Sequence, residues 1–454
     1  MIANSSQNKR DLWLLTGIIL IGLALRGVMF AVAVSHPERT FQPDSQSYLD
    51  PALKLLSNGA YPPDSAYRTP LYPFLIALVY ALGGQNSLLV ILVQVLLGAL
   101  VVFLTYCLGV RILPKPAALI GALLISIDLG SITNVFYILT ETSFTFLLIA
   151  AILAWVEAIQ QDKTTWLIIS SALMGLSALC RPIALYFPIL LAAGLLFIKR
   201  RTWLGLLRQL AIYIGVFLVV LLPWVVRNEL LIGIPTVTTI SNYNLLFYNA
   251  ASLDANLRHI SEIDDRAILQ TRLMQVLSER GWADTTANRD RAEESLALQI
   301  IGRHPGRYAY LHLKSDLNSL LPNVTELTEI IGLTVGGKGT LSVLNQQGLG
   351  AAIRNYFGGN TWLIGVFSPL IVLLGLTYLA DLIGGVELTR QRAWFPLAVL
   401  IFPIAYFLLI PGAASVPRFR VPVGPYLSLL AGMGVYGIYQ WVLARGLKKQ
   451  SRVS

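Results

Sequence analysis

Residues 12–34 read LWLLTGIILIGLALRGVMFAVAV, and the polar stretch FQPDSQSY follows at residues 41–48. The first stretch is almost entirely apolar, although it contains Arg26. About 20 apolar residues in an α-helix are enough to cross the hydrocarbon core of a bilayer. The sequence therefore predicts a first transmembrane helix that leads directly into a polar loop. Because this helix is longer than the apolar part of a signal peptide, we expect it to be retained.

Apolar segments of similar length recur along the chain. Of its 454 residues, 55% are hydrophobic and 13% are charged, and the mean hydropathy is +0.66. Soluble domains usually contain about 25% charged residues. We therefore expect an all-α polytopic membrane protein. About ten full spans are predicted, at residues 12–34, 87–110, 116–138, 142–159, 164–180, 182–198, 203–226, 361–383, 393–411 and 421–444.

The apolar segment 71–83 is short for a crossing, so we interpret it as a partial or interfacial helix on the outer face. Basic residues support this count. With a cytoplasmic N-terminus, pairs such as Lys9-Arg10, Arg111 with Lys115, and Arg390 with Arg392 all fall in inner loops, as the positive-inside rule predicts. Both termini are then cytoplasmic. The net charge of +10 is spread over these loops, which argues against a nucleic-acid partner.

Three regions follow from this topology. Residues 1–226 form an N-terminal transmembrane module with an outer loop at 35–70, and residues 361–454 form the last spans and a cytoplasmic tail. Between them, residues 227–360 are polar, and part of this stretch has helical periodicity with mixed charge. We expect a helical extracytoplasmic insertion, called the cap below.

Cysteine and histidine give no sign of a metal or a disulfide. Cys107 and Cys180 both fall inside predicted spans, and the four histidines are scattered without metal-ligand spacing. We therefore predict neither a metal nor another cofactor.

Asp44 is the first candidate catalytic residue. It lies in the outer loop, with Tyr48 one helical turn later. A carboxylate can remove a proton from an acceptor hydroxyl if burial raises its pKa towards the working pH. Local sequence by itself favours another interpretation, because Pro43-Asp44-Ser45 is typical of a helix start.

Glu141 begins the fourth span on the same face as Asp44, where it either orients the acceptor or the sugar, or is simply a first-turn acid that the helix dipole stabilises. Arg68 precedes the partial helix that contains Tyr72, and its guanidinium can bind a phosphate through paired hydrogen bonds. Interfacial anchoring explains Arg68 and Tyr72 equally well.

Several more arginines lie inside or at the outer ends of spans. A charge within a span usually faces a bundle interior or a cavity, and a lipid phosphate is the natural ligand for a ring of arginines at the outer mouth. We expect such a ring to contain Arg26, Arg68, Arg181, Arg418 and Arg420. Arg227 and Asn228 end the seventh span and are candidates for positioning substrate, together with Tyr48 and Tyr72.

The order of these motifs resembles a known family. The motifs are Asp44 with Tyr48, RTPLYPFL at 68–75, TETSFTFLL at 140–148, LCRP at 179–182, PWVVRN at 223–228 and PRFRVPV at 417–423. Together they resemble the C-class integral-membrane glycosyltransferases, in particular the bacterial family 39 type related to protein O-mannosyltransferases and aminoarabinose transferases. The resemblance extends over residues 12–444.

This resemblance implies a helical bundle with interfacial helices on the outer face, a polyprenyl-phosphate sugar donor and transfer to a glycan, lipid or protein acceptor. It implies a hexosyl- or pentosyltransferase of a bacterial inner membrane that builds envelope glycans such as lipopolysaccharide or glycoproteins. Asp44 carries over as the catalytic acid, Glu141 as the second acidic position, and the arginines as ligands of the donor phosphate.

One position departs from the family. Relatives often have Asp-Glu where this chain has Asp44-Ser45, which weakens the case for a metal. We expect a single inverting displacement in which Asp44 acts as the base, because no second well-placed carboxylate supports a covalent sugar intermediate. Three other interpretations stay open: a flippase or exporter of lipid-linked glycans, an O-antigen polymerase or ligase, and a lipid-binding scaffold in which Asp44 has little effect.

Overall fold

The computed structural model describes residues 2–62, 65–198, 202–322, 324–333, 343, 347–359 and 362–450. Within these ranges the chain is helical and forms no strand, so the predicted all-α fold is confirmed. In the described part of the chain, six helices are long and apolar enough to cross a membrane, and five shorter helices are also apolar. The long helices are α1 (Ile2–Ser35), α4 (Ser87–Ile112), α7 (Glu141–Gln161), α10 (Trp203–Ile232), α19 (Trp362–Arg390) and α21 (Gly424–Gln450). The shorter ones are α3 (Leu71–Gly83), α5 (Lys115–Ser126), α8 (Thr164–Cys180), α9 (Phe187–Ile198) and α20 (Trp394–Leu409).

The remaining helices are more polar or very short, and most of them form the cap. Two lie in the outer loop, on either side of Asp44: η1 (Pro37–Thr40) and α2 (Gln46–Asn58). The cap contains α11 (Ile240–Asn244), η3 (Leu245–Ala250), α12 (Ala251–Arg258), α13 (Glu262–Glu279), α14 (Thr286–Arg303), α15 (Pro305–Asp316), η4 (Leu317–Leu320), α16 (Val324–Ile330) and α18 (Leu349–Tyr356). Short elements between spans are α6 (Leu129–Thr133), η2 (Pro182–Ala184), η5 (Gly412–Ala414) and η6 (Pro417–Val423).

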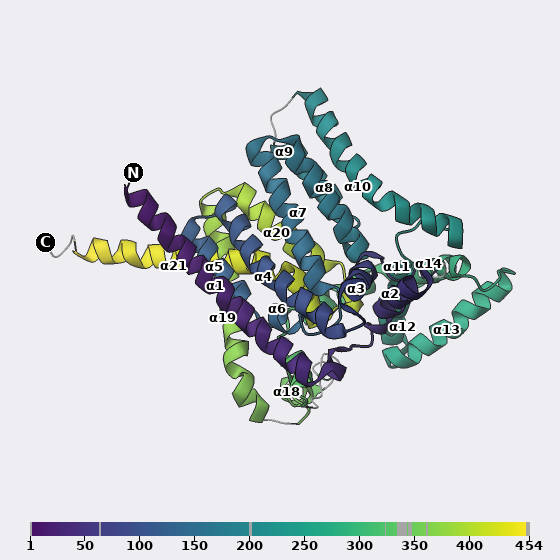
Figure 1. Ribbon diagram of the computed structural model, residues 1–454. Helices are drawn as coiled ribbons and strands as arrows, with labels where there is room; N and C mark the ends of the chain where they lie inside the picture. The colour runs from purple at the N-terminus through teal and green to yellow at the C-terminus, as the bar shows by residue number, and fades with distance from the viewer. Residues whose placement is uncertain are drawn as a thin grey trace.

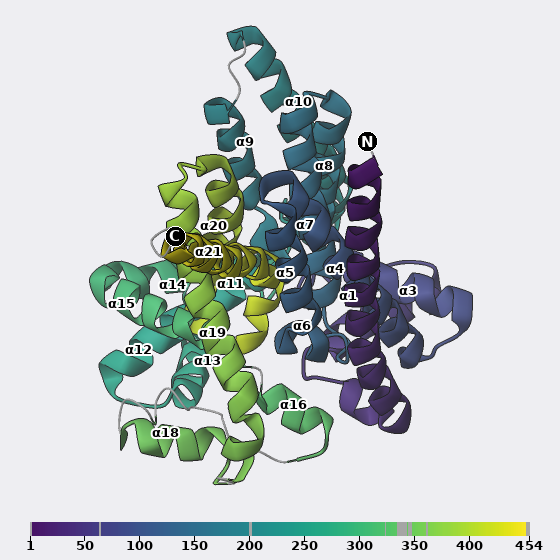
Figure 2. The ribbon, with the colours of Figure 1, turned by 90° about the vertical axis from the view of Figure 1, so that its left-hand side faces the viewer.

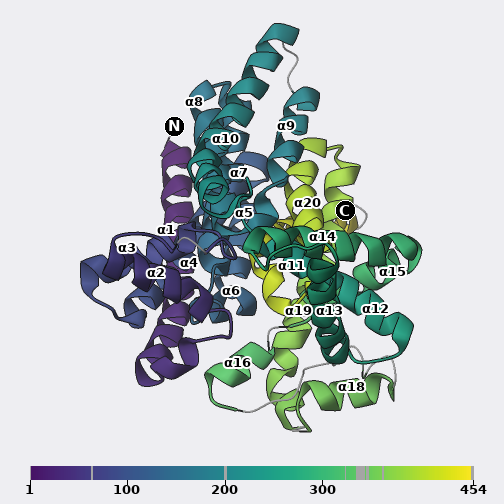
Figure 3. The ribbon, with the colours of Figure 1, turned by 90° about the vertical axis from the view of Figure 1, so that its right-hand side faces the viewer.

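The arrangement separates the chain ends from the cap. Helices α1, α4, α7, α8 and α10 run alongside one another, and α21 leaves this bundle at an angle (Figure 1). Helix α1 begins and α21 ends on the left in Figure 1, whereas α11–α14 lie on the right. Figures 2 and 3 show the cap helices below the upper ends of α9 and α10, close to α19. The short helices α2, α3 and α6 lie at the cap end of the bundle (Figure 1).

One predicted span is broken. We predicted a single helix over 116–138, but α5 ends at Ser126 and the short α6 follows. The break occurs because the Asp128 carboxylate accepts the backbone N–H of Ser131, which starts a new helix. Residues 131–140 are nevertheless all buried. Irregular backbone at membrane depth is tolerated when protein covers it, so apolar composition alone mimicked a continuous span here.

The segment 71–83 does form a separate short helix, as predicted. At about 1.5 Å per residue, α3 is shorter than a bilayer core of about 30 Å. Several predicted span boundaries differ from the structure: α1 begins at Ile2, before the predicted start at 12, and α19 ends at Arg390, beyond the predicted end at 383. The end of the seventh span also differs. Helix α10 continues to Ile232, beyond the predicted end at 226, and Gly233 closes it with a positive φ of 75°.

Helices α19 and α21 cross with their backbones almost in contact. A Cβ added to Gly384 would lie 2.0 Å from the Leu430 carbonyl oxygen, and one added to Gly434 would lie 2.0 Å from that of Ala380. Small residues permit this approach between membrane helices. The crossing matters for the site because η6, which carries two of the candidate arginines, leads directly into α21.

We predict that Gly384→Val lowers the stability of the bundle, because the added carbon atoms force α19 and α21 apart. The expected cost is about 1–3 kcal/mol, typical of overpacking. The adjacent variant Gly385→Val is the control, since no atom lies within 4 Å of its new Cβ. Thermal unfolding in detergent, followed by size-exclusion chromatography, measures both variants. Equal melting temperatures for the two would contradict the close crossing.

Candidate active site

Asp44 lies in a short loop between η1 and α2, and hydrogen bonds to Ile138 fix this loop to the bundle. Ser45 is fully buried, and its hydroxyl donates to the Ile138 carbonyl oxygen at 3.0 Å and accepts the Gln42 N–H at 2.9 Å. The Ile138 N–H in turn donates to the Thr40 carbonyl oxygen. These bonds tie the loop to the irregular segment just before α7, so Asp44 and Glu141 are held on one structural unit.

The helix-cap interpretation of Asp44 is wrong. The N-cap position of α2 is Ser45, and no side chain caps this helix. The Asp44 carboxylate instead binds two guanidinium groups from distant segments: Oδ1 lies 2.8 Å from Arg68 Nη2, and Oδ2 lies 2.6 Å from Arg418 Nη2. About a third of the Asp44 side chain remains exposed.

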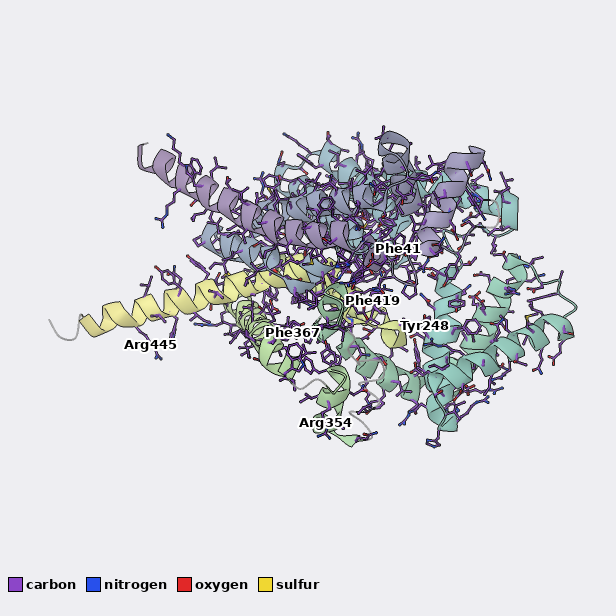
Figure 4. The ribbon with its side chains drawn as sticks, turned by 60° about the horizontal axis from the view of Figure 1, so that its bottom comes forward. Phe41, Tyr248, Arg354, Phe367, Phe419 and Arg445 are labelled. Carbon is purple, nitrogen blue, oxygen red and sulfur yellow. The ribbon has the colours of Figure 1, made fainter. Side chains whose placement is uncertain are left out.

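Glu141 belongs to the same network. It is only 2% exposed, and its Oε1 lies 2.6 Å from Arg181 Nη1 and 3.5 Å from Arg418 Nε. Arg181 also donates to the Thr140 hydroxyl at 3.1 Å. The ring of Phe419 lies beside both cations, 5.1 Å from the Arg181 guanidinium and 5.8 Å from that of Arg418. Figure 4 places Phe419 where the transmembrane helices meet the cap.

The cluster of Asp44, Arg68, Glu141, Arg181 and Arg418 is therefore continuous, and we call it the arginine–acid cluster. Three positive charges and two negative charges leave a net charge of +1. Opposite charges at these distances favour the ionised form of every member. The excess positive charge gives the cluster the electrostatics of an anion-binding site.

The ionisation of Asp44 follows from its partners. Burial by itself would raise the pKa of Asp44, but the charges and hydrogen bonds of Arg418 and Arg68 outweigh burial and lower the pKa below its ordinary value. The expectation that burial raises this pKa is thus wrong for the arrangement described, because the sequence did not reveal the two cations. In this arrangement Asp44 is a weak base, and each of its carboxylate oxygens already accepts a hydrogen bond from a guanidinium group.

Tyr48 packs against Arg68 of the cluster, and Tyr72 packs against Tyr48. The Arg68 guanidinium lies 4.7 Å from the Tyr48 ring, and its Nε donates to the Ser47 hydroxyl at 2.8 Å. The Tyr48 ring packs edge-on against Tyr72, whose hydroxyl donates to Gln94 Oε1 at 2.8 Å in the buried core. Both tyrosines therefore position Arg68 through packing.

Arg26 and Arg420 do not join the cluster, so the predicted ring of five arginines is only partly formed. Arg420 lies two residues after Arg418 on the 3₁₀ helix η6, and its Nη2 binds Asp128 at 2.7 Å. Arg26 is fully buried and donates to the carbonyl oxygens of Gly22 and Ser126 and to the Ser131 hydroxyl. Both arginines thus hold the break between α5 and α6 in place.

We predict that Arg26→Met lowers stability without changing the affinity for lipid phosphate. The variant removes the guanidinium donor from the Ser126 carbonyl oxygen and the Ser131 hydroxyl, at a cost of about 1–3 kcal/mol. A melting curve measures the first effect, and retention of radiolabelled undecaprenyl phosphate by the folded fraction measures the second. If the variant binds less undecaprenyl phosphate while its melting temperature is unchanged, Arg26 contributes to phosphate binding and this prediction is wrong.

Arg227 and Asn228 lie at the cap end of α10, outside the cluster. The Arg227 guanidinium stacks on Trp224 at 4.6 Å and donates to the Pro62 carbonyl oxygen. Asn228 is fully buried, and its Nδ2 donates to the Thr236 carbonyl oxygen at 2.7 Å. Their visible role is to hold the first turn of the cap against the outer loop.

Sequence reasoning missed Ser45 and Phe419 as parts of the site, and Asp128 as the partner of Arg420. A small residue beside a catalytic acid, or an aromatic residue between two arginines, gives no signal of its own. Ser45 also explains the departure from the family pattern, since its position is enclosed and its hydroxyl is bonded on both sides.

The donor set of the cluster does not suit a bridging metal. The Arg418 guanidinium lies between the carboxylates of Asp44 and Glu141, where a shared cation would have to bind. Within the described ranges, no three His, Cys, Asp or Glu side chains gather closely enough to hold a metal.

Comparison with known proteins gives a family match for part of the chain and a match for the fold. Residues 67–226 match the family model for dolichyl-phosphate-mannose-protein mannosyltransferase, a range that includes Arg68, Glu141 and Arg181. The structure matches that of the oligosaccharyltransferase AglB from Archaeoglobus fulgidus in complex with an inhibitory peptide and a dolichol-phosphate, with a TM-score of 0.51 and 16% identity over 98% of this chain and 52% of that one. The chain has the C-class glycosyltransferase fold.

Other structures give similar matches. The apo form of the same oligosaccharyltransferase matches with a TM-score of 0.53 and 14% identity, over 97% of this chain and 52% of that one. ArnT from Cupriavidus metallidurans bound to undecaprenyl phosphate matches more weakly, with a TM-score of 0.39 and 14% identity over 92% and 78% of the two chains. A search of curated proteins by sequence finds no match. The chain spans about half the length of the oligosaccharyltransferases that it matches, and the predicted resemblance to C-class enzymes is confirmed.

Proposed function

We propose that this protein transfers a sugar from a polyprenyl-phosphate donor to an acceptor hydroxyl on the outer face of a bacterial inner membrane, with both termini in the cytoplasm. The observation that carries the proposal is the arginine–acid cluster, in which the partly exposed carboxylate of Asp44 binds Arg68 and Arg418 while a third guanidinium, that of Arg181, binds Glu141. Basic inner loops support the orientation.

The three arginines suit a lipid phosphate. Guanidinium groups bind phosphate oxygens through paired, charge-assisted hydrogen bonds, which also fix the orientation of the ligand. Arg181 is held by Glu141 and Phe419, so it has little freedom to lose on binding. Arg68 and Arg418 at present bind the Asp44 carboxylate, and a phosphate competes for the same two cations.

This competition supplies a physical route to an active base. When donor phosphate takes up hydrogen bonds from Arg68 and Arg418, Asp44 loses the two partners that lower its pKa. The burial of Asp44 then raises the pKa towards the working pH, which improves its ability to accept a proton. Donor binding and the activation of Asp44 are coupled in this way.

The transfer step is a single displacement. Asp44 accepts the proton of the acceptor hydroxyl as that oxygen attacks the anomeric carbon, and the bond from that carbon to the phosphate oxygen breaks. The departing lipid phosphate keeps the electron pair, and the arginines stabilise its charge. The configuration at the anomeric carbon is inverted. Glu141 is 2% exposed and bound to Arg181, which makes it a positioning residue instead of a nucleophile.

An apolar groove offers a path for the polyprenyl tail. Aromatic rings lead to it from the cluster: Phe144 lies near Arg181 and packs on Phe407, which packs on Phe187 at the groove wall. The groove lies between the three apolar helices α7, α9 and α20. Its lining is almost wholly apolar and includes Ile152 and Trp155 on α7, Leu190 and Gly194 on α9, and Ala398 and Phe402 on α20.

We predict that Ala398→Trp raises the KM for the lipid-linked donor roughly tenfold and leaves kcat almost unchanged. The indole fills the groove and displaces the polyprenyl tail. The tail contributes equally to binding of the ground state and of the transition state, so its displacement raises KM and leaves kcat almost unchanged. The lipid-facing variant Val372→Trp on α19, where the native side chain is 58% exposed, is the control. Steady-state kinetics with the purified protein measure both. An unchanged donor KM in Ala398→Trp would place the tail elsewhere.

The function itself is tested in cells that lack the gene and receive it on a plasmid. Mass spectrometry compares envelope glycans and the pool of polyprenyl-phosphate sugars in the presence and absence of the protein. A transferase gives one sugar lost from a glycan in the deletion strain, with accumulation of its lipid-linked donor. If the donor accumulates only on the cytoplasmic side of the membrane, a flippase replaces the transferase, and if neither pool changes, both ideas fail.

A further inference from the structure

A strip of tyrosine rings joins the arginine–acid cluster to the cap. The Arg68 guanidinium lies 5.1 Å from the ring of Tyr67, which lies 5.6 Å from the ring of Tyr243. The Tyr243 ring in turn lies 6.4 Å from that of Tyr248. Figure 4 shows Tyr248 at the junction between the transmembrane helices and the cap. These rings, called the tyrosine strip below, lead from the reacting centre onto α11 and η3.

The strip is fixed on both sides and still reaches solvent. The Thr239 N–H donates to the Ala66 carbonyl oxygen at 3.0 Å, and the Thr238 hydroxyl donates to the Tyr67 carbonyl oxygen at 2.7 Å. Tyr67 is 37% exposed, and Tyr243 and Tyr248 are half-buried. Rigid, partly exposed aromatic rings supply a large contact area at small entropic cost.

Two acids on α14 lie beside the strip and have no role in the transfer step. Asp290 and Glu293 are 9% and 8% exposed, and a spacing of three residues puts them on one face of the helix. Asn242, next to Tyr243, donates to the Asp290 backbone oxygen at 3.4 Å. One carboxylate oxygen of Asp290 is buried without a hydrogen-bond partner. Burial of a polar atom without a hydrogen bond is unfavourable unless a ligand or a water molecule donates one to it.

Burial also changes the protonation of these acids. It raises the pKa of Asp290 to about 6 and, together with Asp290, raises the pKa of Glu293 to about 7. At neutral pH the pair therefore carries less than its full negative charge and offers both donors and acceptors of hydrogen bonds. The tyrosine strip and its neighbours on α14 and α11 therefore offer aromatic faces, the Asn242 amide and two acids.

We propose that the tyrosine strip, with Asp290 and Glu293, binds a saccharide that carries the acceptor hydroxyl. The proposal rests on the transferase function above and names its acceptor class. One face of a sugar ring presents polarised C–H groups, which pack on the negative face of an aromatic ring. The hydroxyls at the ring edge are matched by the acids and the Asn242 amide.

The position of the strip gives the bound saccharide a direction. Its near end is Tyr67, the residue before Arg68, and Arg68 binds Asp44. A saccharide laid along Tyr248, Tyr243 and Tyr67 therefore points its terminal sugar at the carboxylate that takes the proton. The cap then acts as the part of the molecule that selects the acceptor.

Binding without donor tests this assignment separately from catalysis. Saturation-transfer NMR with the full-length protein in nanodiscs is run against neutral oligosaccharides of glucose, galactose, mannose and N-acetylglucosamine. We expect binding of at least one of them, weakened about tenfold by Tyr67→Ala and by Asp290→Ala. Tyr310→Ala is the matched control, since Tyr310 is a 56% exposed cap tyrosine outside the strip. The melting temperature of each variant identifies any loss caused by misfolding.

The outcomes separate the two proposals. Binding that Asp44→Asn retains and Tyr67→Ala loses supports the saccharide strip, even if the transfer reaction proves to be different. No binding of any oligosaccharide, or binding that Tyr67→Ala and Tyr310→Ala weaken equally, overturns the strip and leaves the transferase proposal intact. Binding of a serine- or threonine-containing peptide in place of the sugars also overturns it and makes the acceptor a protein.

Discussion

Asparagine in place of Asp44 is expected to slow sugar transfer by about 10²–10⁴-fold, the usual contribution of a general base. The amide keeps the shape of the carboxylate but cannot accept the proton of the acceptor hydroxyl. It also releases Arg68 and Arg418 from their ion pairs, so donor binding should be unchanged or tighter. Single-turnover kinetics with a polyprenyl-phosphate sugar separate the slower chemical step from binding.

Asp50→Asn provides the matched control for this experiment. Asp50 lies on α2 six positions further along the chain, is exposed and accepts a hydrogen bond from Gln46. Its replacement should leave the transfer rate within about twofold, as for most exposed positions. Loss of less than tenfold in Asp44→Asn, or an equal loss in Asp50→Asn, would show that Asp44 is not the base.

Arg418→Gln is expected to lower kcat/KM for the donor by about 10²–10³-fold, comparable to removing a donor that stabilises transition-state charge. Arg418 contacts both carboxylates of the cluster, so its loss removes a phosphate ligand and the bridge between Asp44 and Glu141. Glutamine retains hydrogen-bonding capacity without the charge. Kinetics as a function of donor concentration and pH measure the effect.

The pH profile of this variant has a predicted sign. Because Arg418 and Arg68 lower the pKa of Asp44, losing one cation raises that pKa. The acidic limb of kcat/KM should then move to higher pH. The pairing itself stabilises the native fold above about pH 4 and is lost as pH falls through the lowered pKa, so Arg418→Gln should also reduce the difference in stability between neutral and acidic pH.

Two further variants complete this test. Arg418→Lys keeps the charge but not the paired hydrogen bonds, and should recover part of the lost activity. Arg307→Gln removes an exposed arginine of the cap that donates to Asn256, and should have little effect. A pH profile that does not move in Arg418→Gln would mean that Arg418 does not control the protonation of Asp44.

The sequence predicted the membrane bundle because apolar length is a local property. Helices at 87–112, 141–161 and 203–232 begin or end close to the predicted positions, since each is a run of apolar residues bounded by polar ones. The prediction failed at 116–138 for an equally physical reason. Buried irregular backbone and a buried helix have the same apolar composition, and only the capping of α6 by Asp128 distinguishes them.

The candidate site was predicted in part. Motif order singled out Asp44, Glu141 and the arginines, but it did not sort the arginines into those that face Asp44 and those that brace α5 and α6. Arg418 and Arg420 are separated by one residue, and they bind Asp44 and Asp128 respectively. A 3₁₀ helix turns about 120° per residue, so neighbours two positions apart leave the helix in very different directions.

By itself, the sequence determined that this chain is a helical membrane protein with acids and arginines at the ends of its spans, because the bilayer imposes hydropathy and length on every spanning segment. Only the tertiary structure decided which charges meet. Asp44 and Arg418 are hundreds of residues apart along the chain and 2.6 Å apart in space. The pairing lowers the pKa of Asp44 and ties its activation to phosphate binding, and a charge can be tuned in this way only by neighbours that folding brings within a few ångströms.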